Sequence, residues 1–162
     1  MTRARLLVGV TALLTTASSV KHAQAQRYAV SMSPAAWRRK LGSARYAILR
    51  EGGTEAPYSS PLDKEFAAGT YACAGCGQMA FSSTTKYHAG EGWPSFWDVL
   101  PGAVRYRKDY QLIGEVRTEV HCSRCGGHLG HRFHDGPQPT GLRYCIDGLA
   151  LRFIPKSGAG RD

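Results

Sequence analysis

The chain lacks an apolar run long enough to cross a membrane comfortably, because a spanning helix needs roughly 20 apolar residues. The N-terminal apolar segment, Leu6–Leu14, is much shorter and follows the basic residues Arg3 and Arg5. Small residues at Ala23–Ala25 then match the positions that a signal peptidase reads. The pattern predicts a signal peptide over residues 1–25 and export, with the bacterial periplasm as the expected compartment. A membrane anchor formed by the uncleaved segment is the alternative.

A basic stripe interleaved with aromatic residues is also missing, although the formal net charge is +9. Three of those charges, Arg3, Arg5 and Lys21, leave with the signal peptide and no acidic residue leaves with them, so +6 remains on residues 26–162. The remaining charges are scattered along the chain. We therefore expect no nucleic-acid partner.

The densest basic run, Trp37–Lys40, is better explained by the solvated face of a helix. Ser33 is placed to cap that helix, Pro34 suits its first position, and Gly42 suits its end. A phosphate-binding patch is the alternative, and no further basic stripe supports it.

Helical periodicity, internal repeats and low-complexity segments are absent from the rest of the chain. Glu51–Leu62 reads as a loop, and Pro61–Phe66 is compatible with one helical turn. Short stretches rich in aromatic and branched residues follow between turn residues: TYAC, MAFSS, VRYRK, EVRTEVHC, HLGHRF, LRYCID and LALRF. We predict one mainly β domain over residues 26–162, with antiparallel strands and short N-terminal helices.

Cysteine is scarce, and four of the five cysteines form two C-x-x-C pairs, Cys73 with Cys76 and Cys122 with Cys125. Two such knuckles present four thiolates in a tetrahedron, which suits one structural Zn²⁺ per chain. Disulfides are the alternative in an oxidising compartment. A redox-active dithiol is less favoured, because the strand-to-helix context that it needs is missing.

The fifth cysteine, Cys145, lies in an apolar run without a partner in the sequence pattern. Alternate residues of an extended strand share a face, so Arg143, Cys145 and Asp147 point one way while Tyr144 and Ile146 point to the core. A charged face is an unusual place for a structural cysteine. A small buried side chain in a strand is the other interpretation.

Two further segments carry residues that suit a site. In His128–Gly136, alternation places His131, Phe133 and Asp135 on one face, unless Gly130 introduces a bulge. A histidine and a carboxylate beside a thiol would form a proton donor and its orienting group, although core or surface histidines are the alternative. Trp93 precedes Pro94, which favours a loop that either walls an apolar pocket or joins the core.

The motifs GTEAPYS, YACAGCG, GWPSF, RTEVHCSRCGGHLGHRFHDGP and GLRYCIDGLALRF occur in this order between Ser33 and Phe153. Together they resemble the methionine sulfoxide reductase B family, which reduces the R epimer of methionine sulfoxide. The resemblance implies two antiparallel sheets and a four-cysteine zinc site away from the chemistry. It also implies that Cys145 attacks the sulfoxide sulfur, which yields methionine and a sulfenic acid that an external reductant restores to the thiol.

Carried onto this sequence, the resemblance makes His131 the proton donor to the sulfoxide oxygen, with His128 and Asp135 assisting or holding it. Arg143 favours the thiolate. Trp93 and Phe133 are expected to receive the methyl group of the substrate. The expected substrate is oxidised methionine in proteins, and the expected enzyme is a monomer without stable membrane association once the signal is removed.

Three positions depart from the family pattern. Asp147 stands where the family usually carries Asn, close enough to offset Arg143, since unit charges roughly 6.7 Å apart interact by about 2.5 kcal/mol at a dielectric near 20. Glu91 stands where many members carry a resolving cysteine, which predicts a one-cysteine enzyme reduced by an external thiol, such as a thioredoxin-like protein. His134 replaces a common proline, with no consequence that the sequence reveals.

Two other classes of function use the same four cysteines. One is a zinc-knuckle module that binds nucleic acid or protein, and the other is a zinc-buffering protein. Neither gives Cys145 or Trp93 a role, so the sequence favours the enzyme.

Overall fold

The computed structural model describes residues 28–157. The predicted signal peptide, residues 1–25, lies outside this range and stays a prediction. Within residues 28–157, no helix is both long and apolar enough to cross a bilayer.

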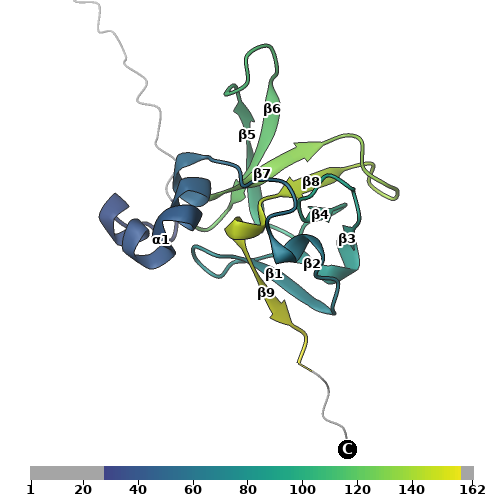
Figure 1. Ribbon diagram of the computed structural model, residues 1–162, viewed down its shortest axis with the longest axis horizontal. Helices are drawn as coiled ribbons and strands as arrows, with labels where there is room; N and C mark the ends of the chain where they lie inside the picture. The colour runs from purple at the N-terminus through teal and green to yellow at the C-terminus, as the bar shows by residue number, and fades with distance from the viewer. Residues whose placement is uncertain (1–27, 158–162) are drawn as a thin grey trace, which may run out of the picture.

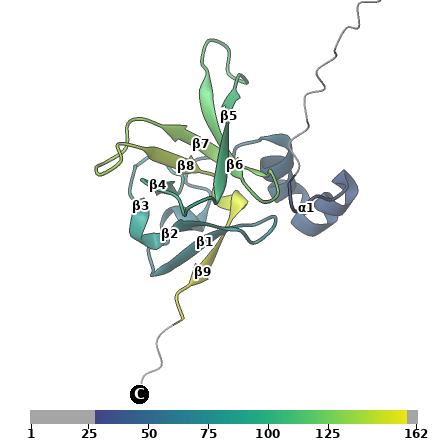
Figure 2. The same cartoon turned by 180° about the vertical axis from the view of Figure 1, so that it is seen from behind.

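Two antiparallel sheets make up the fold, as the sequence predicts (Figure 1). The three-stranded sheet has the order β2 (Met79–Ser82), β1 (Gly69–Cys73) and β9 (Leu151–Pro155). The six-stranded sheet has the order β3 (Lys86–Tyr87), β4 (Ser95–Phe96), β8 (Arg143–Ile146), β7 (His128–Phe133), β6 (Arg117–Cys122) and β5 (Val104–Asp109). In both views helix α1 lies beside the sheets, and the β5–β6 hairpin projects from the body of the molecule (Figures 1 and 2).

Each predicted strand segment contains a strand, but the sequence did not reveal β3 and β4. These strands have two residues each, which is too short for an alternating pattern to be recognised. The predicted loop before Pro94 is present, and pairing with β8 begins at Ser95. The segment around Trp93 is therefore a loop that leads directly into the sheet.

Helix α1 spans Pro34–Glu51 and begins as predicted, because the Ser33 hydroxyl accepts a hydrogen bond from the Ala36 amide at 3.2 Å. The first helical segment also ends at Gly42, as predicted, but the sequence did not reveal that a second helical segment follows it. Gly42 leaves the helical conformation (φ 71°, ψ 171°), but a second helical segment follows and ends at Gly52. Buried side chains in that segment, among them Leu49, pack on the core and stabilise it.

Three short 3₁₀ helices complete the described elements: η1 (Pro61–Asp63), η2 (Ser83–Thr85) and η3 (Gly148–Ala150). The first confirms the helical turn predicted within Pro61–Phe66.

An aromatic cluster joins the two sheets. Phe81 from β2 stacks on Phe96 from β4 with ring centroids 4.5 Å apart, and Tyr71 from β1 meets Phe96 edge-on at 5.0 Å. All three side chains are fully buried. Such aromatic pairs contribute about 1 kcal/mol each beyond the burial of their area. The cluster therefore fixes β4 and its neighbour β8 against the smaller sheet.

A bulge interrupts the pairing of β7 with β6. Val120 pairs with Gly130, but the next residue, His121, pairs with His128, so Leu129 is the extra residue. Leu129 lies in the core. Alternation alone would place His128 and His131 on opposite faces of the strand. The bulge returns them to the same face, where their ring centroids lie 5.2 Å apart.

Gly130 allows this bulge to form beside β8. Its φ is 150°, and a Cβ at this position would lie 2.1 Å from the Cys145 carbonyl oxygen. Only glycine therefore permits β7 to approach β8 so closely at the level of Cys145.

Candidate active site and metal centre

A pocket of about 140 Å³ lies over β7 and β8. It brings together five of the residues that the sequence predicts for the site: Trp93, His131, Phe133, Cys145 and Asp147. Thr54, Glu91, Arg117 and Gly130 complete its lining. The pocket is therefore apolar on the side of its aromatic residues and polar elsewhere.

Strand β8 positions Cys145 between two neighbours. In the antiparallel registers, Cys145 lies opposite Ser95 of β4 and opposite His131 of β7. Tyr144 and Ile146 are buried in the core. The alternation expected for this strand is present, and it turns the half-buried Cys145 toward the pocket.

The loop before β4 fixes the indole of Trp93. Its Nε1–H donates to the Glu55 carbonyl oxygen at 3.2 Å, and the Tyr58 amide donates to the Gly92 carbonyl at 2.7 Å. Trp93 is thus held as a wall of the pocket by the segment that follows α1.

His131 is oriented by Asp109, which the sequence analysis did not identify. The His131 Nε2 lies 2.7 Å from Asp109 Oδ2. Burial alone would raise the pKa of Asp109, but hydrogen bonds from the Gln111 amide, His131 and Arg117 outweigh it and hold the pKa at about 2. An ionised carboxylate only accepts hydrogen bonds, so Nε2 carries the proton and Nδ1 has the lone pair.

The second histidine has a similar carboxylate partner. His128 Nδ1 lies 2.9 Å from Glu119 Oε1, and Arg107 binds the same carboxylate. Burial opposes the ionisation of Glu119, but the bonds from His128 and Arg107 lower its pKa to about 2. His128 Nε2 lies 3.7 Å from Asp147 Oδ2, which is too long for a hydrogen bond.

Asp135 does not contact His131, the partner expected for it. Its carboxylate instead accepts two hydrogen bonds from Arg143, at 2.9 and 2.8 Å. Asp135 lies two residues beyond the end of β7, so strand alternation no longer governs where it points. Arg143 also donates to Glu91 at 2.5 Å and lies 4.4 Å from the centre of the Phe133 ring. Its charge is therefore shared between two carboxylates.

Cys145 is held as the thiol and not as the thiolate. Burial raises its pKa to about 12; Arg143 opposes this rise, while Glu91 and Asp147 add to it. The direction expected for Asp147 thus agrees with the electrostatics of the site. A neighbouring base must remove the proton when Cys145 reacts, because the thiolate is the nucleophile.

Two bases of suitable strength face the pocket. Burial lowers the pKa of His131, against the opposing effect of Asp109, so its imidazole is neutral at pH 7. Burial raises the pKa of Asp147 to about 6, although its Oδ1 accepts a 3.0 Å hydrogen bond from the Glu55 amide. His131 is the better placed of the two, because it lies directly opposite Cys145.

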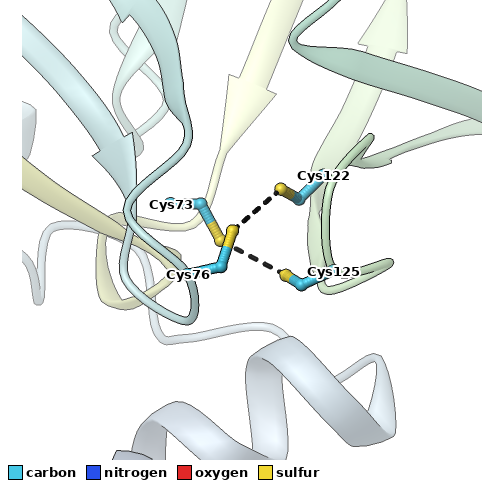
Figure 3. A group of neighbouring side chains, drawn as sticks. All are labelled: Cys73, Cys76, Cys122 and Cys125. Carbon is cyan, nitrogen blue, oxygen red and sulfur yellow. Dashed lines mark hydrogen bonds between the residues drawn. The ribbon is translucent and has the colours of Figure 1, made fainter. Parts of the chain in front are cut away.

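The remaining four cysteines form a separate cluster (Figure 3). Cys73 ends β1 and Cys76 lies in the turn that follows, while Cys122 ends β6 and Cys125 lies in the turn that follows it. Their sulfur atoms all lie within 4.8 Å of one another. The cluster therefore joins a turn of the smaller sheet to a turn of the larger one.

The sulfur geometry suits a metal ion. Cys73 Sγ and Cys125 Sγ are 3.7 Å apart, and Cys76 Sγ and Cys122 Sγ are 3.5 Å apart. Four sulfurs at about 2.3 Å from a tetrahedral zinc ion would be about 3.8 Å from one another. None of the five cysteines in residues 28–157 forms a disulfide. The group can hold a metal ion, as the C-x-x-C spacing predicts.

A family model described as the SelR domain matches residues 41–155. The chain belongs to the SelR domain family. The matched range includes the pocket residues and all five cysteines.

Curated relatives of this SelR chain carry the name peptide methionine sulfoxide reductase MsrB. The Leptospira interrogans protein is 51% identical over 127 residues, which cover 78% of this chain and 96% of the relative. The Agrobacterium fabrum protein is also 51% identical over 127 residues, with 78% and 93% covered. The Thiobacillus denitrificans protein is 52% identical over 123 residues, with 75% and 92% covered. The resemblance to methionine sulfoxide reductase B is confirmed.

Sequence reasoning missed three carboxylates of the SelR site: Asp109, Glu119 and Glu55. The Glu55 carboxylate accepts hydrogen bonds from the Gly148 and Leu149 amides at 2.6 and 2.9 Å, directly after Asp147. Glu119 lies among the buried residues of β6, but this burial is apparent only in the structure. The partners of Asp109 and Glu55 depend on contacts between distant segments, which no local pattern reveals.

Asp147→Asn is expected to make Cys145 alkylate about tenfold faster at pH 8. The amide removes a negative charge that raises the thiol pKa, and a change of one pKa unit changes the thiolate fraction tenfold. Rates with iodoacetamide measure the effect. At pH 5, below the Asp147 pKa of about 6, the wild-type carboxyl is largely protonated and the two rates should converge. Equal rates at pH 8 would show that Asp147 does not act on Cys145.

Proposed function

We propose that this protein reduces the R epimer of methionine sulfoxide in proteins to methionine, with Cys145 as the nucleophile. The observation that carries this proposal is the pocket in which Cys145, His131 and Trp93 meet. The relatives named peptide methionine sulfoxide reductase support the same activity.

The pocket suits the end of a methionine sulfoxide side chain. Trp93 and Phe133 offer aromatic surface to the methyl group and the sulfur, a contact that sulfur makes favourably. His131 offers a polar group to the oxygen. The two epimers exchange oxygen and lone pair around sulfur, so a fixed methyl position admits only one of them with its oxygen at the proton donor.

The proposed reduction transfers a single proton, that of the Cys145 thiol. His131 Nδ1 takes the thiol proton of Cys145, and Asp109 stabilises the imidazolium that forms. The proton then passes to the sulfoxide oxygen as the thiolate attacks sulfur. The attack joins the two sulfur atoms; the S–O bond of the substrate and this S–S bond then break as the hydroxyl group is transferred to Cys145 Sγ. Methionine is released, reduced by two electrons, and Cys145 is oxidised by two electrons to the sulfenic acid. No proton is consumed in this half-reaction.

We propose that an external thiol protein of the thioredoxin type completes the cycle. The sulfenic acid and two thiols give the Cys145 thiol, one disulfide and water. Glu91, at the position of the family's resolving cysteine, lies at the pocket and bonds Arg143. Cys145 is the one cysteine that lines the pocket among the described residues, so the structure supports a one-cysteine cycle.

We also propose that the protein acts as a monomer outside the cytoplasm, after cleavage near residue 25. The basic and apolar pattern of residues 3–14 supports export. The mass of the purified protein tests cleavage.

A metal-binding module or a zinc buffer is the weaker proposal for the function, because neither needs the pocket beside Cys145.

The metal proposed for the four-cysteine cluster is Zn²⁺. Four thiolates without an open position are typical of structural zinc, and this cluster ties the two sheets together. When bound, the ion would stabilise the fold and take no part in the reduction.

Cys76→Ser is expected to lower the zinc content from about one ion per chain to almost none. The loss of the metal should lower the melting temperature by about 10 °C, which corresponds to roughly 3 kcal/mol in a domain of this size. Metal analysis and thermal unfolding measure both effects. Cys145→Ser is the matched control and should keep its zinc. Full zinc content in Cys76→Ser would contradict the assignment of the cluster.

The proposed activity is tested with separated R and S epimers of a capped methionine sulfoxide and dithiothreitol as reductant. The wild-type protein should reduce the R epimer at least about a hundredfold faster, since two mismatched contacts of about 1.4 kcal/mol each give that factor. Cys145→Ser should lose the activity and keep its fold. Undiminished turnover in Cys145→Ser, or equal rates for both epimers, would refute the proposal.

A further inference from the structure

The loop between β5 and β6, residues 110–116, exposes a cluster of apolar side chains. Tyr110, Leu112, Ile113 and Val116 are each exposed by about half or more, and Ile113 is fully exposed. Single exposed apolar residues are normal, but a cluster on one loop marks an interaction surface. The hairpin that carries this loop projects from the body of the molecule (Figure 2).

The loop begins and ends at the wall of the pocket. Asp109 and Arg117 form the last pair of the β5–β6 ladder and are joined by a 2.8 Å ion pair. Asp109 holds His131, and Arg117 lines the pocket. The apolar loop is therefore a direct continuation of the catalytic wall.

The loop also lies near the opposite wall. The Gln111 side-chain amide is 3.1 Å from the point where a Cβ on Gly52 would lie. Gly52 begins the segment that carries Thr54, another residue of the pocket lining. The loop is thus tied to the pocket at its two ends and approaches the segment of Thr54 at Gln111, so it forms an edge, or rim, beside the pocket.

A protein substrate must cross this rim. The pocket volume of about 140 Å³ accommodates a side chain but not a polypeptide. Residues on either side of the methionine sulfoxide therefore lie outside the pocket, against its edge. Methionine is usually buried, so the segments in which its oxidation matters carry apolar neighbours that become exposed when packing is lost.

We propose that residues 110–116 form a docking surface for unfolded polypeptide segments in which apolar residues flank the methionine sulfoxide. This inference rests on the proposed function and adds a preference among protein substrates. The loop carries Glu115 and no cationic side chain, which disfavours an anionic lipid surface as its occupant.

The test compares three R-sulfoxide substrates: a peptide with leucines flanking the sulfoxide, a matched peptide with serines, and a capped single residue. The double variant Leu112→Ser with Ile113→Ser removes the apolar surface, and Ile154→Ser on β9 is the control for loss of an exposed isoleucine. For the leucine peptide, the double variant should raise KM about tenfold, which equals 1.4 kcal/mol, and leave kcat unchanged. The capped residue should be reduced with unchanged KM by all three proteins.

Other results would overturn the docking surface. If the double variant lost the same factor in kcat/KM on all three substrates, the loop would act through the Asp109–His131 contact. If its KM for the leucine peptide were unchanged, the loop would not touch the substrate. Dimerisation of the wild type that the double variant abolishes would assign the loop to a second copy. If the wild type reduces none of the substrates, the proposed function itself fails; these outcomes are distinguishable because the wild type is measured on each.

Discussion

The pairing of β8 with β4 on one side and β7 on the other is the constraint on which the site depends. It places Cys145 opposite both Ser95 and His131. A shift of the β8 register by one residue would point the Cys145 thiol into the core, because side chains alternate along a strand. Gly130 permits the close approach of β7, and the aromatic cluster holds β4 against the smaller sheet. The same contacts that close the core therefore place His131 opposite the proposed nucleophile Cys145.

Two buried carboxylates near the pocket differ in their pKa because their hydrogen-bond partners differ. Asp109 receives bonds from an amide, a histidine and an arginine, which keep its pKa at about 2. Asp147 receives one from the Glu55 amide, and burial raises its pKa to about 6. Arg143 cannot activate Cys145 alone, since Glu91 and Asp135 share its charge. We therefore propose that the Asp109–His131 pair deprotonates the thiol, while Asp147 raises the pKa of that thiol.

The sequence was sufficient for features that local patterns determine. Stretches of aromatic and branched residues between turn residues indicated the longer strands, alternation indicated the face of Cys145, and the C-x-x-C spacing indicated the metal-binding cluster. Features that depend on register were not accessible: Asp109 meets His131 across three strands, and Asp135 turns to Arg143 only because β7 has ended. Strands of two residues carry no periodic signal, and the helix beyond Gly42 is stabilised by tertiary burial that its sequence does not show.

The most direct test is a single turnover with the R epimer in the absence of any reductant, followed by mass analysis of the peptide that contains Cys145. The account predicts one added oxygen on that peptide and one methionine released per chain. Loss of two hydrogen atoms would instead reveal a disulfide with another cysteine. Released methionine with an unchanged Cys145 would show that this thiol is not the nucleophile.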